Sequence, residues 1–187
     1  MSGFIETWTG AQLKLPDPDP TQIRIEDIAH ALCQVPRFAG HLDEFYSVAE
    51  HSLNVAAVVW EKTNSEIEAF QALLHDATEA YISDIPTPFK LLMPDYQRIE
   101  ENLWGAIATK YGVPVELYPS VKEADRIMLM TERDALKPHA SDWGEKYEST
   151  PRLSPEAWNQ YSDIGQVEED FLALFHALHD KVNTGNN

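Results

Sequence analysis

Hydrophobic residues recur at helical spacing over most of the chain. From Ile25 to Leu32 they fall three and four positions apart, and the spacing returns between Ser47 and Lys62. Residues spaced in this way lie on one face of an α-helix, so the pattern predicts amphipathic helices that bury one face. Further helices are expected over residues 65–79, 94–111, 119–136 and from about 154 or 166 to 182.

Short signals mark where several of these helices begin or end. Ser47 is followed three residues later by Glu50, and Ser65 by Glu68. This spacing is typical of a capping box, in which the serine and the glutamate each satisfy a free backbone N–H. Gly112 follows the 94–111 pattern and is expected to end that helix.

Proline-rich and polar stretches separate the helical patterns. Prolines in segments 15–20 and 84–88 exclude a regular helix there. Residues 4–15 alternate loosely and predict a short hairpin, whereas residues 138–153 predict an exposed loop. No long strand pattern competes, so the sequence predicts a compact, all-α helical bundle with a frayed tail at residues 183–187.

The composition fits one globular domain over residues 1–187, with residues 1–20 as an extended N-terminal arm. Hydrophobic residues make up 43% of the chain, which is enough for a sizeable core. The longest apolar run, Val55 to Trp60, is far shorter than the roughly 20 residues that span a bilayer. The N-terminus shows no signal-peptide pattern, and a lone Cys33 excludes an intrachain disulfide. We therefore expect a cytoplasmic protein, in the host cytoplasm if the gene belongs to a phage.

The formal net charge of −17 limits the partners of the protein. Such a surface repels nucleic acids and anionic membranes at long range, so neither is expected to bind. It also repels free nucleotides, and a nucleotide site would need local cations or a metal. The charge has two interpretations: it favours solubility, or it imitates nucleic acid and attracts a basic partner.

An apolar segment carries three ionisable residues at close spacing. His75 and Glu79 are four apart and would share one face of a helix, and Asp76 lies one step round from His75. Burying these groups without partners would cost several kcal/mol. A divalent cation is one partner that suits a neutral imidazole and a carboxylate together.

Two other predicted helices supply the ligands that would complete a metal site. His51 and Asp125 each lie within apolar surroundings. Either residue alone is more often structural than a ligand, so the prediction depends on the combination with His75 and Asp76. Two imidazoles and two carboxylates suit Zn, Mn, Fe or Co better than Ca, and they leave coordination positions for water and a phosphate oxygen.

These motifs resemble those of the HD-domain phosphohydrolases, a family named for its histidine–aspartate metal site. The matching segments are FYSVAEHS at 45–52, LHDATE at 74–79, DIPTPFK at 84–90 and VKEAD at 121–125. Within the family, residues 37–41 are similar to small phage and prophage deoxynucleotide phosphohydrolases, which include enzymes that remove triphosphate from dATP.

The resemblance implies roles for the matched ionisable residues. His51, His75, Asp76 and Asp125 would bind a divalent transition metal such as Zn, Mn or Co, and Mg could accompany the phosphates. Glu79 would orient or deprotonate the attacking water, which is work that suits a carboxylate near a cation.

A second group of matched residues would contact the substrate. Arg37 and Lys90 would bind phosphate, and Phe38 would pack on the base or the sugar. Asp84 would contact the sugar hydroxyl or assist the water, and His41 could reach phosphate. Each has a structural alternative: a helix cap for Arg37, core packing for Phe38, a turn for Asp84, a solvated charge for Lys90 and a structural hydrogen bond for His41.

The resemblance favours hydrolysis of the ester between C5′ and the α-phosphate of a deoxynucleotide. The preferred substrate is dATP, cleaved to deoxyadenosine and triphosphate, with activity on dADP and dAMP. The alternative is a 5′-deoxynucleotidase that acts on deoxynucleoside monophosphates with the same ligands. A homo-oligomer, either a dimer or a hexamer, is also implied. Three tryptophans would suit the subunit contact if they are exposed, and burial in the core is the equal alternative: Trp104, Trp143 and Trp158.

Two readings from other classes remain. A di-iron oxidase would need further histidine ligands, and no second His-Asp pair is visible; His176 and His179 are expected to be surface residues of a helix. A non-catalytic acidic binding protein with a vestigial ligand set is the other alternative.

Overall fold

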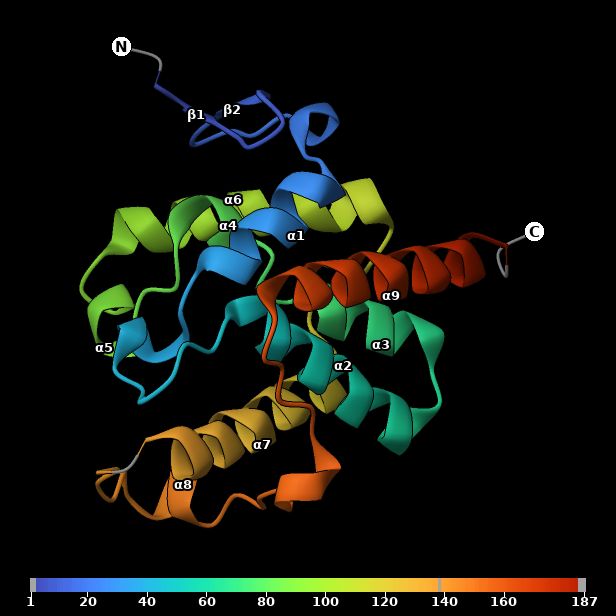
Figure 1. The fold of residues 1–187 in the computed structure, drawn as a ribbon. Helices are drawn as coiled ribbons and strands as arrows, with labels where there is room; N and C mark the ends of the chain where they lie inside the picture. Colours follow the sequence, from blue (N-terminus) through green and yellow to red (C-terminus); the bar gives the residue numbers. More distant parts are fainter. Residues whose placement is uncertain (1–2, 138, 185–187) are drawn as a thin grey trace.

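Helices make up most of the computed structural model, which describes residues 3–137 and 139–184 (Figure 1). The helices are α1 Ile25–Gln34, α2 Val48–Thr63, α3 Glu66–Leu74, α4 Glu79–Ile82, α5 Thr87–Lys90, α6 Pro94–Tyr111, α7 Pro119–Leu136, α8 Glu145–Glu148 and α9 Ile164–Thr184. Short 3-10 turns occur at Pro20–Gln22, Arg37–Gly40 and Pro155–Ala157. The all-α prediction is confirmed.

Helix α2 is the centre of the bundle. It packs against α1, α3, α7 and α9, and Figure 1 shows it between α9 above and α7 below. Of its 16 residues, 11 are buried, including both apolar and polar side chains. A helix that is buried around most of its circumference lies in the interior of a fold. The buried polar side chains of α2 must therefore find their partners inside the protein.

The N-terminus of α2 has the capping box that its sequence predicts. The Ser47 hydroxyl accepts a hydrogen bond from the Glu50 backbone N–H at 3.2 Å. The Glu50 carboxylate in turn accepts from the Ser47 backbone N–H at 2.8 Å. At α3, the Ser65 hydroxyl accepts from the Glu68 N–H at 3.5 Å, and the Glu68 carboxylate is engaged elsewhere, with Ser120.

The two caps should therefore differ in their contribution to stability. We expect Ser47→Ala to lower the free energy of unfolding by about 1 kcal/mol, at least as much as Ser65→Ala, because it breaks a buried and reciprocal cap. Urea denaturation of both variants and the wild type tests this. A larger loss for Ser65→Ala would contradict the assignment of the stronger cap to α2.

The predicted N-terminal hairpin is present and rests on the helical bundle. Strands β1 (Phe4–Glu6) and β2 (Gln12–Lys14) pair in antiparallel register. The Thr9 backbone N–H donates to Asp27 of α1 at 2.7 Å, and the Trp8 ring stacks on His30 at 4.4 Å between centroids. The hairpin is thus attached to α1 by polar and aromatic contacts.

The helix predicted over residues 65–79 is interrupted at the residues expected to bind the metal. Helix α3 ends at Leu74, residues 75–78 form turns, and α4 begins at Glu79. Tight backbone hydrogen bonds from Ala77 to Leu74 and from Glu79 to Asp76 replace the α-helical pattern. The prediction that these residues share one continuous helix is therefore wrong.

Other boundaries also differ from the sequence expectation. Short helices α5 and α8 form inside segments that were expected to be irregular. Helix α9 begins at Ile164, which agrees with the predicted start near residue 166 and not with the alternative start near residue 154. Trp158 is buried, and the Asn159 backbone bonds reciprocally with the Asn54 amide of α2, which holds this stretch outside a helix. Of the predicted tail, residues 183–184 belong to α9 and residues 185–187 lie outside the described part of the chain.

The tryptophans proposed for a subunit contact are largely used inside the chain. Trp158 is only 8% exposed, and the half-buried Trp104 donates its indole N–H to the Val115 carbonyl. Trp143 keeps 36% of its surface exposed. Within residues 3–137 and 139–184, none of the helices has the length and apolar character needed to cross a membrane.

Candidate functional site

Three separate elements bring the four predicted metal ligands together. His51 comes from α2, His75 and Asp76 from the turn after α3, and Asp125 from α7. His51 Nε2 lies 3.2 Å from Asp125 Oδ1, and His75 Nε2 lies 3.3 Å from Asp76 Oδ2. Ligand atoms of His51, His75 and Asp125 all lie within 4.8 Å of one another. Asp76 Oδ2 is also 3.7 Å from His51 Nε2, so it belongs to the same cluster.

Both imidazoles present an unpartnered nitrogen to this cluster. The Nε2 atoms of His51 and His75 are buried and have no hydrogen-bond partner. His75 Nδ1 lies 2.7 Å from the Ala72 carbonyl, which can only accept, so Nδ1 carries the proton and the neutral ring has its lone pair on Nε2. A lone pair that faces carboxylates calls for a cation between them, and a divalent metal fits this donor set.

The surroundings of His51 also favour positive charge. Burial and the charge of Arg37 lower the pKa of this imidazole, but the carboxylates of Glu132 and Asp125 outweigh both and raise the pKa to about 10. Without another cation, the ring would therefore hold a proton. A site that stabilises positive charge on its own ligand is suited to a bound metal ion.

Solvent reaches the cluster through Asp125. The His51 side chain is 0% exposed and Asp76 is 20% exposed, whereas Asp125 is 43% exposed. The cluster is thus closed at α2 and accessible at α7.

Arg37 lies beside the candidate metal ligands, in the 3-10 turn that follows α1. Its guanidinium is 3.6 Å from Asp76, 3.9 Å from Asp84 and 3.5 Å from Glu132, and its backbone N–H donates to the Tyr46 carbonyl. Burial opposes the charge, yet these carboxylates hold the pKa of Arg37 above its ordinary value. The structure therefore places this cation at the cluster and not at a cap of α1.

Glu79 and Lys90 form an ion pair close to the carboxylates of the cluster. Glu79 is 4% exposed, its Oε2 atom has no hydrogen-bond partner, and its Oε1 atom lies 3.7 Å from Lys90 Nζ. Burial raises the pKa of Glu79 well above its ordinary value, and the negative charges of Asp76 and Asp84 add to the effect. Lys90 also bonds to Glu100 at 2.7 Å, so it is a partly buried ion-pair residue and not a solvated charge.

Asp84 follows α4 and faces Arg37. Burial raises the pKa of its carboxyl, although the charge of Arg37 opposes the rise. Its neighbour Ser83 has a positive φ of 65°, which turns the chain back toward the cluster. The structure thus places Asp84 next to Arg37 and the cluster.

The remaining two predicted substrate contacts are placed differently. The half-buried Phe38 ring lies 5.7 Å from the Arg37 guanidinium carbon and 6.5 Å from the Trp143 ring. His41 is exposed, and its carbonyl accepts from Lys137 at 3.1 Å. Among the described residues, the His41 ring makes no hydrogen bond or ion pair with the cluster. The structure therefore brings Phe38 beside Arg37 but does not bring His41 to the ligands.

Glu132 of α7 belongs to the site and was missed by the sequence analysis. Its side chain is 0% exposed, and its Oε1 atom lies 2.6 Å from His51 Nδ1. The signal that could have found it is its spacing of seven from Asp125, which places both residues on one face of α7. Glu132 was missed because, in the sequence, a glutamate next to Arg133 looks like an ordinary surface residue that forms an ion pair.

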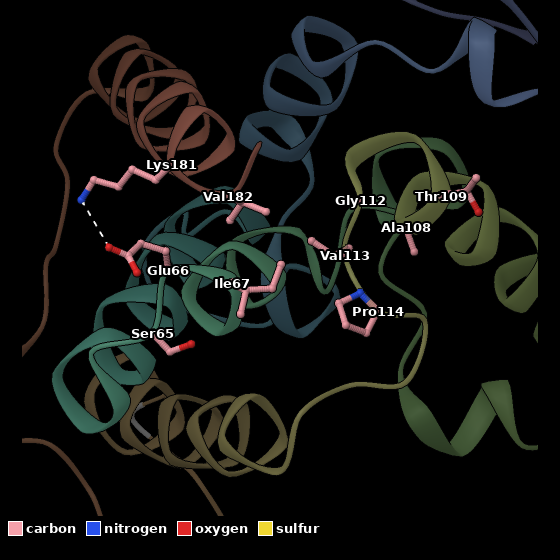
Figure 2. Close-up of a pocket in the computed structure, with 10 residues that line it drawn as sticks. All are labelled: Ser65, Glu66, Ile67, Ala108, Thr109, Gly112, Val113, Pro114, Lys181 and Val182. Atoms are coloured by element: carbon pink, nitrogen blue, oxygen red, sulfur yellow. Dashed lines mark ion pairs between the residues drawn. The ribbon is translucent and has the colours of Figure 1, made fainter. Parts of the chain in front are cut away.

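Two surface grooves lie away from this cluster. One, of about 630 Å³, runs between the start of α3 and the end of α6, with the Lys181–Glu66 ion pair at its edge (Figure 2). The other, of about 530 Å³, lies among α2, α3 and α9, and includes Trp60. Neither groove is lined by a predicted site residue, so neither is the counterpart of the histidine–aspartate cluster.

Fold and site together define a mostly helical protein with a histidine–aspartate cluster whose two imidazoles are buried. The chain is 47% identical over 133 residues to the uncharacterized protein YfdR of Escherichia coli K12, an alignment that spans 71% of this chain and 72% of that protein. The chain therefore belongs to the same family as YfdR. It is also 39% identical over 121 residues to the uncharacterized protein RCAP_rcc00048 of Rhodobacter capsulatus, which covers 62% of each protein. No protein-family model matches the sequence.

Proposed function

We propose that this protein is a metal-dependent phosphohydrolase that cleaves a deoxynucleotide between C5′ and the α-phosphate. The observation that carries the proposal is the pair of buried, unpartnered imidazole nitrogens of His51 and His75, which face two carboxylates. The proposed substrate is dATP, which would yield deoxyadenosine and triphosphate, with dADP and dAMP as further substrates. The resemblance of the motifs to HD-domain enzymes supports the choice of reaction.

The four clustered side chains would hold Zn, Mn or Co. When bound, such an ion acts as a Lewis acid on a phosphate oxygen and makes a bound water more acidic. The accessible side at Asp125 is where a phosphate group would approach.

Arg37 would orient the phosphate. Its guanidinium lies 3.5 to 3.9 Å from its carboxylate neighbours, and its Nε atom has no hydrogen-bond partner. Because these ion pairs are long, the guanidinium N–H groups of Arg37 remain able to donate hydrogen bonds to a phosphate. A guanidinium binds phosphate in a bidentate manner. In a chain with a net charge of −17, Arg37 and Lys90 supply the local positive charge that an anionic substrate needs.

Glu79 would take the proton of the attacking water. Its burial beside other carboxylates raises its pKa, which makes its carboxylate a stronger base than an exposed glutamate. The Lys90 ammonium lies 3.7 Å from Glu79 Oε1. Glu79 Oε2 has no hydrogen-bond partner, so no protein group would compete with a water for this oxygen.

The expected effect of Glu79→Gln is a fall in kcat of about 100- to 10,000-fold, because the amide keeps the shape but cannot accept the proton. Metal content should stay at the wild-type level, since Glu79 is not among the proposed ligands. Glu123→Gln is the matched control and should keep full activity, because Glu123 is an exposed glutamate of α7 that pairs with Lys62 of α2. An unchanged rate in Glu79→Gln would rule out this role.

Product analysis tests the proposed reaction. The purified protein is incubated with each of the four deoxynucleoside triphosphates and monophosphates, in the presence of Mn, Co or Zn, and the products are separated by chromatography. Release of triphosphate and deoxyadenosine from dATP would support the proposal. Cleavage of monophosphates alone would select the 5′-deoxynucleotidase alternative, and a metal-loaded protein that cleaves none of these compounds would contradict the proposed function.

A further inference from the structure

Glu132 is the least exposed carboxylate among the described residues, and its two oxygens face different parts of the site. Oε1 lies 2.6 Å from His51 Nδ1 and accepts a hydrogen bond from the Tyr46 hydroxyl at 3.0 Å. Oε2 faces the Arg37 guanidinium at 3.5 Å. A charge buried this deeply is costly unless its partners compensate it, so its position between His51 and Arg37 requires an explanation.

The contact with His51 fixes which nitrogen faces the cluster. A carboxylate only accepts, so the short contact places a proton on Nδ1 and directs Nε2 toward Asp76 and Asp125. Carboxylates in this arrangement orient a histidine ligand and increase its basicity. The Tyr46 hydroxyl, itself bonded to the Asn54 amide at 3.2 Å, holds Glu132 in turn.

The second contact of Glu132 is with Arg37, the cation proposed to bind phosphate. Arg37 comes from the turn after α1, whereas His51 comes from α2 and Glu132 from α7. One buried carboxylate therefore contacts both a candidate metal ligand and the cation beside it. Loss of the Glu132 carboxylate should disturb both His51 and Arg37. This holds even though Glu132 contacts His51 at Nδ1, on the side of the ring away from the cluster.

We propose that Glu132 is a positioning residue that directs His51 Nε2 into the metal cluster and holds Arg37 next to it. This inference rests on the proposed metal-dependent function. It differs from a purely structural role, in which Glu132 would only neutralise Arg37 and would leave the affinity for metal unchanged.

The test is a Co²⁺ titration followed by the visible absorption of the metal-loaded protein. Glu132→Gln keeps the size of the side chain but removes its charge, and we expect the affinity for Co²⁺ to fall about 10- to 100-fold. The KM for the deoxynucleotide should also rise, because Arg37 loses its anchor. Glu50→Gln is the matched control: it changes another buried glutamate, at the cap of α2, and should lower stability without changing the affinity for Co²⁺.

The outcomes separate this inference from the proposed function. Equal affinity of Glu132→Gln and the wild type for Co²⁺ would overturn the positioning role and leave the metal-dependent function standing. A wild-type protein that binds no Co²⁺, Zn²⁺ or Mn²⁺ would overturn both. If Glu132→Gln does not fold, Glu132→Asp, which keeps the charge but shortens the side chain, is compared with Glu50→Asp: a selective loss of affinity supports the role, and equal affinities overturn it.

Discussion

His75→Ala is expected to abolish tight metal binding and to lower the rate of deoxynucleotide cleavage by about 1000-fold or more. The imidazole Nε2 atom lies 3.3 Å from Asp76 and 4.0 Å from Asp125, so its loss leaves one imidazole for two carboxylates. Metal-ion catalysis contributes several kcal/mol, and each 1.36 kcal/mol is a factor of ten in rate. Metal content by mass spectrometry and product release by chromatography measure the two effects.

A second histidine provides the control for this variant. His176 is exposed on α9, and His176→Ala should keep wild-type metal content and activity. Thermal denaturation of the metal-free proteins shows whether His75→Ala still folds, which is expected because His75 lies in a turn after α3. Full metal content and activity in folded His75→Ala would contradict the proposed metal site.

Phe70→Ala is expected to lower the free energy of unfolding by about 3 to 5 kcal/mol, the range for deleting a buried aromatic ring. The Phe70 side chain on α3 is 0% exposed, and its ring packs 5.3 Å from the ring of Phe175 on α9. Its removal leaves a cavity where α3 meets α9. Urea denaturation followed by circular dichroism measures the loss.

An exposed phenylalanine shows how much of this effect comes from burial. Phe89 on α5 is 63% exposed, and Phe89→Ala should change the stability by no more than about 0.5 kcal/mol. Similar losses for Phe70→Ala and Phe89→Ala would mean that the assignment of Phe70 to the core is wrong.

Local sequence signals were sufficient for the helices that end at a cap. The Ser47–Glu50 box locates the start of α2, and Gly112, with a positive φ of 72°, ends α6. Both signals act within a few residues and do not depend on the rest of the fold. The break after Leu74 has no such marker, since neither a glycine nor a proline lies at residues 75–78.

The candidate ligands could be predicted from the sequence because each is a polar residue in an apolar helical pattern. His51 and Asp125 stood out for this reason, and the structure places them 3.2 Å apart. Glu132 did not stand out, since a glutamate beside an arginine usually lies on the surface. His41 was predicted only from its motif, and the fold leaves it exposed.

The burial of α2 around most of its circumference has a consequence for amide hydrogen exchange. Amides in such a helix exchange with solvent mainly when the whole domain unfolds, whereas those of weakly packed segments exchange through local opening. A ligand that binds only the folded protein lowers the equilibrium population of the unfolded protein by a factor of 1 + [L]/Kd. The exchange rates of the α2 amides, His51 among them, therefore report the affinity of any bound ion or nucleotide without an activity assay.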